Sequence, residues 1–147
     1  MYDDVLVPTD GSAGAERAFE RALDLAETYD ARLLVLHVVD VSSEAGEFRP
    51  VTVLEDLRER GAELTADLAD RAADAGLDDV RTEVLDGVAH RAILSYVEDH
   101  GVDVVVMGTH GRTGLQRYLL GSVAEKVVRL SDVPVLTVRA SEGENDE

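Results

Sequence analysis

Short apolar runs rich in valine alternate along the whole chain with segments whose apolar residues recur at helical spacing. This alternation is typical of βαβ units, which build a mostly parallel sheet. The near-continuous apolar run at residues 32–39 predicts a strand that helices cover on both faces. The run at residues 102–107 is the most hydrophobic in the chain and predicts a central strand. The five predicted strands are residues 4–7, 32–39, 80–85, 102–107 and 133–138.

Four helices are predicted in the intervals between these strands, the second beginning at Thr52. The third and fourth are predicted at about residues 89–98 and 122–130, whereas residues 40–50 lack periodicity and predict a surface loop. Apolar residues three and four apart define the face of a helix that turns toward the core. The inward faces are predicted to carry Ala15, Ala18, Phe19, Ala22 and Leu25 in the first helix, and Leu54, Leu57, Leu64 and Leu68 in the second.

Right-handed crossovers between five such strands predict an α/β fold, Rossmann- or flavodoxin-like. It is a single doubly wound parallel sheet in the order 3-2-1-4-5 with helices on both faces. The winding then reverses between strands one and four, and ligands of open α/β sheets bind at the carboxyl ends of the strands that flank such a reversal. Here those ends are residues 8–12 and 108–114. One domain is predicted over residues 1–140, followed by a charged tail, residues 141–147, that is expected to be frayed.

The chain is strongly acidic, with 31 acidic against 14 basic residues and a net charge of -17. At roughly molar salt the Debye length falls to about 3 Å, which screens the repulsion within such a surface. This favours a halophilic protein of a salt-rich cytoplasm, although an ordinary acidic protein kept soluble by its charge is the alternative. Nucleic acids and anionic lipids are expected to be repelled.

Several classes of site and location are excluded by what the sequence lacks. Without cysteine there is no disulfide scaffold and no thiolate zinc site. The N-terminus has no basic region, and no long apolar stretch follows, so no secretion signal and no membrane span are expected and a cytoplasmic location is predicted.

Glycines are concentrated between the predicted central strand and the last helix, at Gly108, Gly111, Gly114 and Gly121. Glycines allow backbone N–H groups to approach a ligand closely, and the N-terminus of a helix attracts anions. Ser122 is predicted to cap that helix. Residues 104–124 contain no acidic residue but do contain His110, Arg112 and Arg117, which favours an anionic ligand in so acidic a chain. An ordinary loop with structural glycines is the alternative.

Other chemistries find little support in the sequence. No glycine–lysine pair occurs, which excludes a Walker A loop. Ser12 resembles the serine of a nucleophile elbow, but Asp10 occupies the place of the first glycine, so Ser12 is interpreted as a helix cap. His37 is predicted to be a satisfied core histidine, and His90 and His100 lie ten residues apart and share no metal-binding face. No catalytic residue and no metal site are predicted.

The glycine-rich segment fits the signature G-x2-G-x9-G-S at Gly108, Gly111, Gly121 and Ser122. It resembles the phosphate loop of the universal stress protein family, in its nucleotide-binding branch. The resemblance covers nearly the whole chain. VLVPTDGSAGAERAFERAL is similar to the family's first strand and helix, LLVLHVVD to its second strand, VDVVVMGTHGRTGLQRYLLGSVAEKVV to its most characteristic block, and VPVLTVR to its last strand.

The resemblance implies an adenine nucleotide, with Asp10 as the polar partner of the ribose or base and Val38 lining the adenine pocket with its backbone. It places the phosphates over the glycines and the start of the last helix, and any Mg²⁺ would be bound through the phosphates. A hydroxyl sometimes found after Val123 is replaced here by Ala124, so AMP or ADP is expected to bind nearly as well as ATP. The predicted binding residues are Pro8, Thr9, Asp10, Val38, Met107, Gly108, His110, Gly111, Arg112, Gly121, Ser122 and Val123.

The resemblance also implies a homodimer in which the strand at residues 133–138 pairs with its symmetry mate. Pairing would satisfy an apolar sheet edge, although Pro134 limits it on one side. A monomer whose edge is covered by the acidic tail is the alternative. The predicted function is a nucleotide-sensing or signalling module of the stress response. A slow ATPase and a dimer that binds no nucleotide are the alternatives. Hydrolysis is disfavoured because the loop offers no carboxylate to position water.

Overall fold

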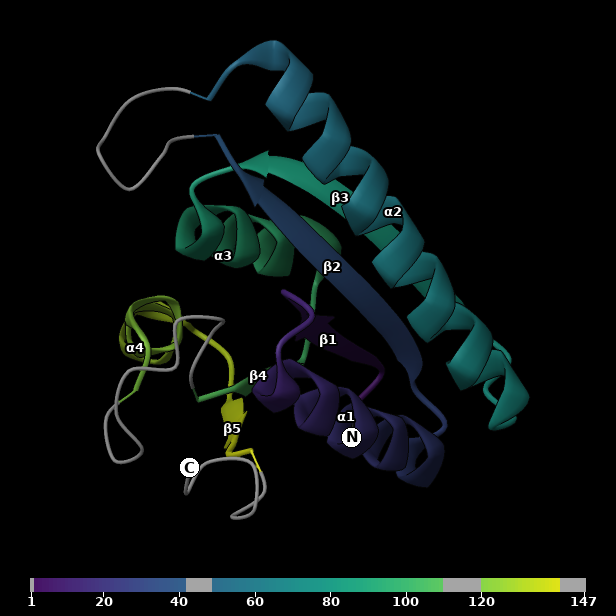
Figure 1. Ribbon diagram of the computed structural model, residues 1–147. Coiled ribbons are helices and arrows are strands. Elements are labelled where there is room, and N and C mark those ends of the chain that lie inside the picture. The colour runs from purple at the N-terminus through teal and green to yellow at the C-terminus, as the bar shows by residue number, and fades with distance from the viewer. Residues whose placement is uncertain (1, 42–48, 110–119, 141–147) are drawn as a thin grey trace.

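The computed structural model describes residues 2–41, 49–109 and 120–140, in which strands and helices alternate (Figure 1). The strands form one parallel sheet in the order β3-β2-β1-β4-β5, which confirms the predicted fold and strand order. The elements are β1 Asp4–Pro8, α1 Ala13–Tyr29, β2 Arg32–Asp40, α2 Val51–Asp74, β3 Val80–Gly87, α3 Ala89–His100, β4 Val104–Gly108, α4 Ser122–Leu130 and β5 Val135–Val138. Most of the predicted loop at residues 40–50 and the predicted tail at 141–147 lie outside the described residues.

The sheet separates two apolar clusters, because successive side chains of a strand point to opposite faces. Along β1, Val5 and Val7 pack with α1 and α2, whereas Leu6 packs with α3 and α4. Figure 1 shows the same division, with α1 and α2 on one side of the strands and α3 and α4 on the other. The central strands are therefore buried on both faces, as their uninterrupted apolar runs predicted.

Helix α1 begins as predicted, with Ser12 as its cap. The Ser12 hydroxyl accepts a hydrogen bond from the Ala15 N–H at 3.2 Å. The inward face is buried as predicted except at one position, where Ala26 is fully buried and Leu25 is half-buried. Small alanines on this face allow the helix to lie close to the strands.

Helix α2 differs from the prediction in how much of its face is buried. Its buried residues, Gly61, Thr65, Leu68 and Ala72, begin only at Gly61, and the predicted inward residues Leu54, Leu57 and Leu64 are half-buried. At its start Val51 is 67% exposed. Helical period shows which side of a helix is apolar, but it does not show how far the sheet extends beneath that side.

Arginines on the surface are paired with some of the many carboxylates. Arg58 forms a two-pronged pair with Asp86, with Nε 2.9 Å from Oδ2, and this hydrogen bonding lowers the pKa of Asp86. Such exposed pairs contribute little to stability individually. The other pairs join Arg32 to Asp4, Arg60 to Asp56, Arg71 to Glu16, Arg81 to Asp79 and Arg129 to Glu125. None of the helices in the described part of the chain is long and apolar enough to span a membrane.

Candidate functional site

The carboxyl ends of β1 and β4 lie side by side at the point where the winding of the sheet reverses. Beyond β4, the Thr109 N–H donates to the Val138 carbonyl of β5 at 3.0 Å. The Thr109 carbonyl in turn accepts from the Gly121 N–H at 2.6 Å. The start of α4 is thereby fixed to the end of β4, the strand next to β1 in the sheet.

Local hydrogen bonds define the turn after β1. Thr9 is buried, and its hydroxyl accepts from the Gly11 N–H at 3.2 Å. Asp10 Oδ1 accepts from the Ser12 N–H at 3.0 Å, and Gly11 adopts a left-handed φ of 81° that favours glycine. The predicted residues Pro8, Thr9 and Asp10 thus form one ordered segment at the sheet edge.

Gly108 is a point of close approach between β4 and α1. A Cβ atom built on Gly108 would lie 2.8 Å from the backbone carbonyl carbon of Gly14 and 3.1 Å from the Ala15 nitrogen. A side chain at Gly108 would therefore require the helix to move away from the strand.

Three predicted apolar residues of the site belong to one cluster, on the face of the sheet that α3 and α4 cover. Met107 is buried there, and Val38 and Val123 are partly buried against the same cluster. Strands β2 and β4 and helix α4 each contribute one of these residues. The structure therefore brings into one cluster predicted binding residues that are up to 85 positions apart in the sequence, from Val38 to Val123.

The start of α4 is not capped as predicted. Gly121 is the N-cap residue, with no side-chain cap, and Ser122 is the first residue of the helix. The prediction that Ser122 caps α4 is therefore wrong: the chain enters the helix one residue earlier, where glycine has no side chain to offer. The first N–H groups of a helix have no partner within it, so, as far as the described residues go, this end leaves donors for an anion.

The remaining predicted residues His110, Gly111 and Arg112 lie outside the described residues, as do Gly114 and Arg117. The described flanks still tie the two ends of this segment together, through the hydrogen bond between Thr109 and Gly121.

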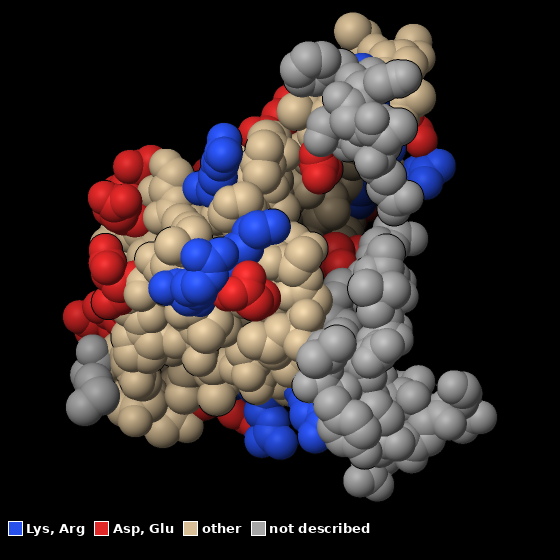
Figure 2. All heavy atoms as spheres, turned by 90° about the vertical axis from the view of Figure 1, so that its left-hand side faces the viewer, with Lys and Arg blue, Asp and Glu red and all other residues tan. Residues whose placement is uncertain are grey.

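Cations gather on the side of the molecule where α3 and α4 lie. Figure 2 looks toward that side and shows Lys and Arg side chains close together near its middle, with acidic side chains beside them and more toward the left margin. Burial lowers the pKa of His90 on α3, and nearby Lys126, Arg91 and Arg129 lower it further. Both causes disfavour the protonated, positively charged form of His90.

His37 was predicted only as a core histidine, but it contacts the site. It is half-buried, and its Nδ1 lies 2.8 Å from the Thr9 carbonyl oxygen. The hydrogen-bonded state agrees with the prediction, whereas the contact with the turn after β1 was missed. The sequence carries one signal for this contact. His37 directly precedes Val38, and both lie near the end of a strand that was predicted to pair with the first strand.

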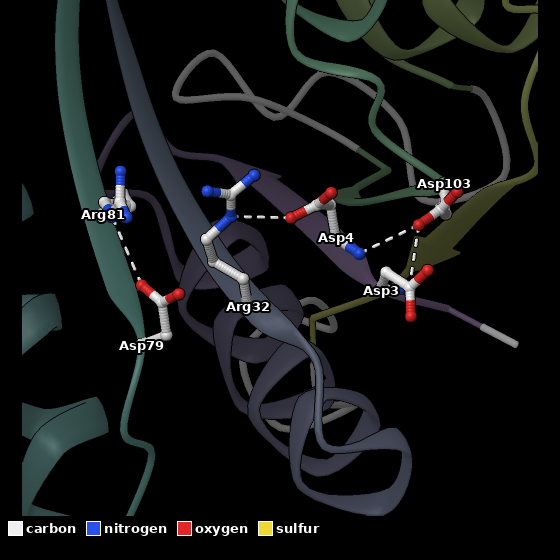
Figure 3. Close-up of polar contacts among 6 residues, drawn as sticks. All are labelled: Asp3, Asp4, Arg32, Asp79, Arg81 and Asp103. Carbon is white, nitrogen blue, oxygen red and sulfur yellow. Dashed lines mark hydrogen bonds and ion pairs between the residues drawn. The ribbon is translucent and has the colours of Figure 1, made fainter.

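A concave region lies at the opposite end of the sheet, at the amino ends of the strands, and is unsuited to an anion. This cavity of about 520 Å³ is lined by Asp3, Asp4, Glu27, Asp30, Asp78 and Asp79, with Arg32 among them. Figure 3 shows Arg32 directed at Asp4, and Asp103 accepting from the N–H groups of Asp3 and Asp4. Among the described residues, no group of three or more His, Asp or Glu side chains is arranged to hold a metal ion.

Comparison with known proteins agrees with this architecture. The model of the universal stress protein family matches residues 1–139. A universal stress protein of Methanocaldococcus jannaschii, MJ0531, is 38% identical over 142 residues, covering 95% of this chain and 83% of its own length.

Two solved structures share the fold and a similar level of identity. That of MJ0577, also from Methanocaldococcus jannaschii, has a TM-score of 0.81 and 31% identity, covering 97% of this chain and 99% of its own. A universal stress protein in complex with cAMP has a TM-score of 0.75 and 30% identity, covering 95% of this chain and 99% of its own. From the extent of the family match and the identity to these relatives, this chain is a member of the universal stress protein family.

Proposed function

We propose that this protein binds an adenine nucleotide at the carboxyl edge of the sheet and acts as a sensing or signalling module of the stress response. The base and ribose would lie against Val38 and the turn containing Asp10, and the phosphates at the start of α4. The observation that carries the proposal is the uncapped first turn of α4, fixed to β4 beside the β1 turn.

The contrast between two helix starts supports this assignment. At α1 the Ser12 hydroxyl takes up the Ala15 N–H, so that end is satisfied from within the chain. At α4 the cap residue is Gly121, which has no side chain, and no other side chain in the described part of the chain caps this helix. Donors left at a helix N-terminus, together with the helix dipole, favour a phosphate group.

Charge and relatives give independent support. A chain of net charge -17 repels a nucleotide. This repulsion is weaker near residues 104–124, because that segment contains no acidic residue. The related structure that contains cAMP shows that a universal stress protein 30% identical to this chain accommodates an adenine nucleotide.

Binding without turnover is the favoured form of this function. Hydrolysis needs a group that orients water at the γ-phosphate. Position 124, where a hydroxyl could contact a third phosphate, is alanine. AMP, ADP and ATP are therefore all candidate ligands, with Mg²⁺ bound through the phosphates. Slow ATP hydrolysis is the second candidate.

Calorimetric titration tests the proposal. We expect AMP, ADP and ATP each to bind ligand-free protein at high salt with micromolar dissociation constants, about -8 kcal/mol. Mg²⁺ should change the affinity for AMP least, because AMP carries one phosphate. Absence of binding by all three would refute the proposal, and release of phosphate from ATP would favour the slow ATPase.

We also propose a homodimer through β5, the strand at one end of the sheet order. Exposed apolar side chains support this, since Leu136 on β5 is 43% exposed and Val128 and Leu130 on α4 are 43% and 49% exposed. The strand begins at Val135, two residues later than predicted, and the Pro134 carbonyl accepts from the Val105 N–H at 3.0 Å.

Light scattering during size-exclusion chromatography tests the dimer. Leu136→Asp should convert a dimer of about twice the 15.9 kDa chain mass into monomer, because a carboxylate at a β5 pairing would be desolvated. Val51→Asp, at the exposed start of α2 and away from β5, is the control for added charge. A wild-type chain that elutes as a monomer would contradict the proposal.

The halophilic, cytoplasmic interpretation stays a prediction. It rests on the net charge of -17 and would be tested by thermal unfolding in rising KCl. Screening of acidic repulsion should raise the midpoint, and a midpoint independent of salt would contradict it.

A further inference from the structure

His37 lies where β1 separates from β2, on the face of the sheet that α2 covers. The register of the two strands ends with Pro8 opposite Leu36. One residue further, the Thr9 N–H still donates to the Leu36 carbonyl at 2.8 Å. The imidazole of His37 then contacts the Thr9 carbonyl, with Nδ1 2.8 Å from the oxygen. Because a carbonyl oxygen only accepts, Nδ1 carries the proton.

This contact replaces a bond of the sheet. In a parallel ladder, a residue whose N–H donates to residue j−1 of its neighbour accepts through its carbonyl from the N–H of residue j+1. Since Thr9 donates to Leu36, its carbonyl would accept from the Val38 N–H if the ladder continued. The His37 side chain donates to that carbonyl instead, and the β1–β2 register does not extend to Val38.

The consequence concerns the backbone of Val38. Backbone groups of alternate strand residues point to the same neighbour, so the N–H and carbonyl of Val38 point toward β1, as those of Leu36 do. Where β1 has turned away, no described residue of β1 pairs with either of those two groups. One donor next to one acceptor matches the edge of adenine that carries N1 and the amino group.

The imidazole is held in this position by helix α2. A Cβ atom on Gly61 would lie 2.5 Å from His37 Cδ2 and 3.2 Å from Cγ, so the ring packs directly on the helix backbone. Leu64, one turn along, also reaches the turn after β1, because a Cβ on Gly11 would lie 3.7 Å from Leu64 Cδ2. The ring therefore has little freedom to leave the Thr9 carbonyl.

We infer that His37 is a positioning residue for the base: its donation to the Thr9 carbonyl ends the β1–β2 ladder and leaves the backbone of Val38 to recognise adenine. This inference rests on the proposed nucleotide function and specifies how the protein recognises the adenine base. His37 acts through Thr9 and Val38 and need not touch the ligand itself.

The test compares AMP with IMP, whose base presents a carbonyl and an N–H where adenine has an amino group and an acceptor. The variants are His37→Leu, which keeps bulk but has no donor, and His37→Asn, whose amide nitrogen lies near the position of Nδ1. His37→Leu should weaken AMP binding about five- to tenfold, the effect of roughly one hydrogen bond, and IMP binding much less. His37→Asn should restore most of the preference for AMP.

The preference ratio is measured on folded protein, so it separates positioning from a general loss of stability. If His37→Leu does not fold, the AMP-to-IMP affinity ratio is measured in Gly61→Ala instead. The added methyl group displaces the His37 ring. Absence of AMP binding by the wild-type chain would refute the proposed function together with this inference. Wild-type binding with an unchanged AMP-to-IMP ratio in His37→Leu, or equal losses in the Leu and Asn variants, would overturn this inference alone.

Discussion

Gly121→Val is expected to weaken AMP binding on the order of a hundredfold. Gly121 has φ -64° and ψ 160°, extended backbone that any residue can adopt. Glycine is therefore not required there for conformation, and what it provides is space in front of the first N–H groups of α4. A branched side chain would cover those donors, and losing two hydrogen bonds to a charged group has an effect of this size.

Calorimetry with AMP, together with thermal unfolding of the unliganded variant, checks this result. Stability should change by no more than about 1 kcal/mol, because the backbone conformation suits valine. Ser122→Ala is the matched control: it removes one hydroxyl and leaves the N–H groups accessible, so a smaller loss is expected. Unchanged AMP affinity in Gly121→Val would show that the phosphates do not bind at the start of α4.

Gly108→Val is expected to lower the free energy of unfolding by about 3 kcal/mol or more. The Cβ atom alone would lie 2.8 Å from the Gly14 carbonyl carbon, and backbone on both sides leaves no flexible side chain to move aside. Overpacking of this kind typically costs about 1–3 kcal/mol, and the two further methyl groups add to it. A domain of this size has about 5–15 kcal/mol in total.

Denaturant unfolding of Gly108→Ala and Gly108→Val measures this cost, which should increase from the first variant to the second. Gly101→Ala is the control: it has φ 63° and no atom within 4 Å of an added Cβ, so only the cost of a left-handed backbone, about 1–2 kcal/mol, is expected. If Gly108→Val were no more costly than Gly101→Ala, the close approach of β4 and α1 would not limit the fold.

The order of elements and the topology were predictable because both depend on local pattern and on general rules of chain connection. Valine-rich runs predicted the strands, and right-handed crossovers reduced the topologies to a few, of which the doubly wound order 3-2-1-4-5 was the natural one. The start of α1 was equally local, since Ser12 hydrogen-bonds a residue three positions away. Local interactions of this kind need no knowledge of what lies across the sheet.

Errors arose where the answer depended on distant parts of the chain. Leu54, Leu57 and Leu64 were predicted to face the core from α2, yet they are only half-buried, and the buried positions of this helix begin at Gly61. Which part of a helix lies over the sheet depends on the tertiary structure. Ser122 has the chemistry of a cap, but the entry of the chain into α4, fixed by the bond between Gly121 and Thr109, makes Gly121 the cap residue.

The sequence by itself determined the fold, the family and the segments that supply the proposed site, because periodicity, glycine spacing and charge are properties of the chain order. Only the tertiary structure decided which atoms meet. It brought Gly108 against Gly14, the start of α4 against the end of β4, and the His37 ring against Thr9 and Gly61. These contacts depend on strand register and on the distance between helix and sheet, to an accuracy of a few tenths of an ångström, which no pattern of residue types encodes.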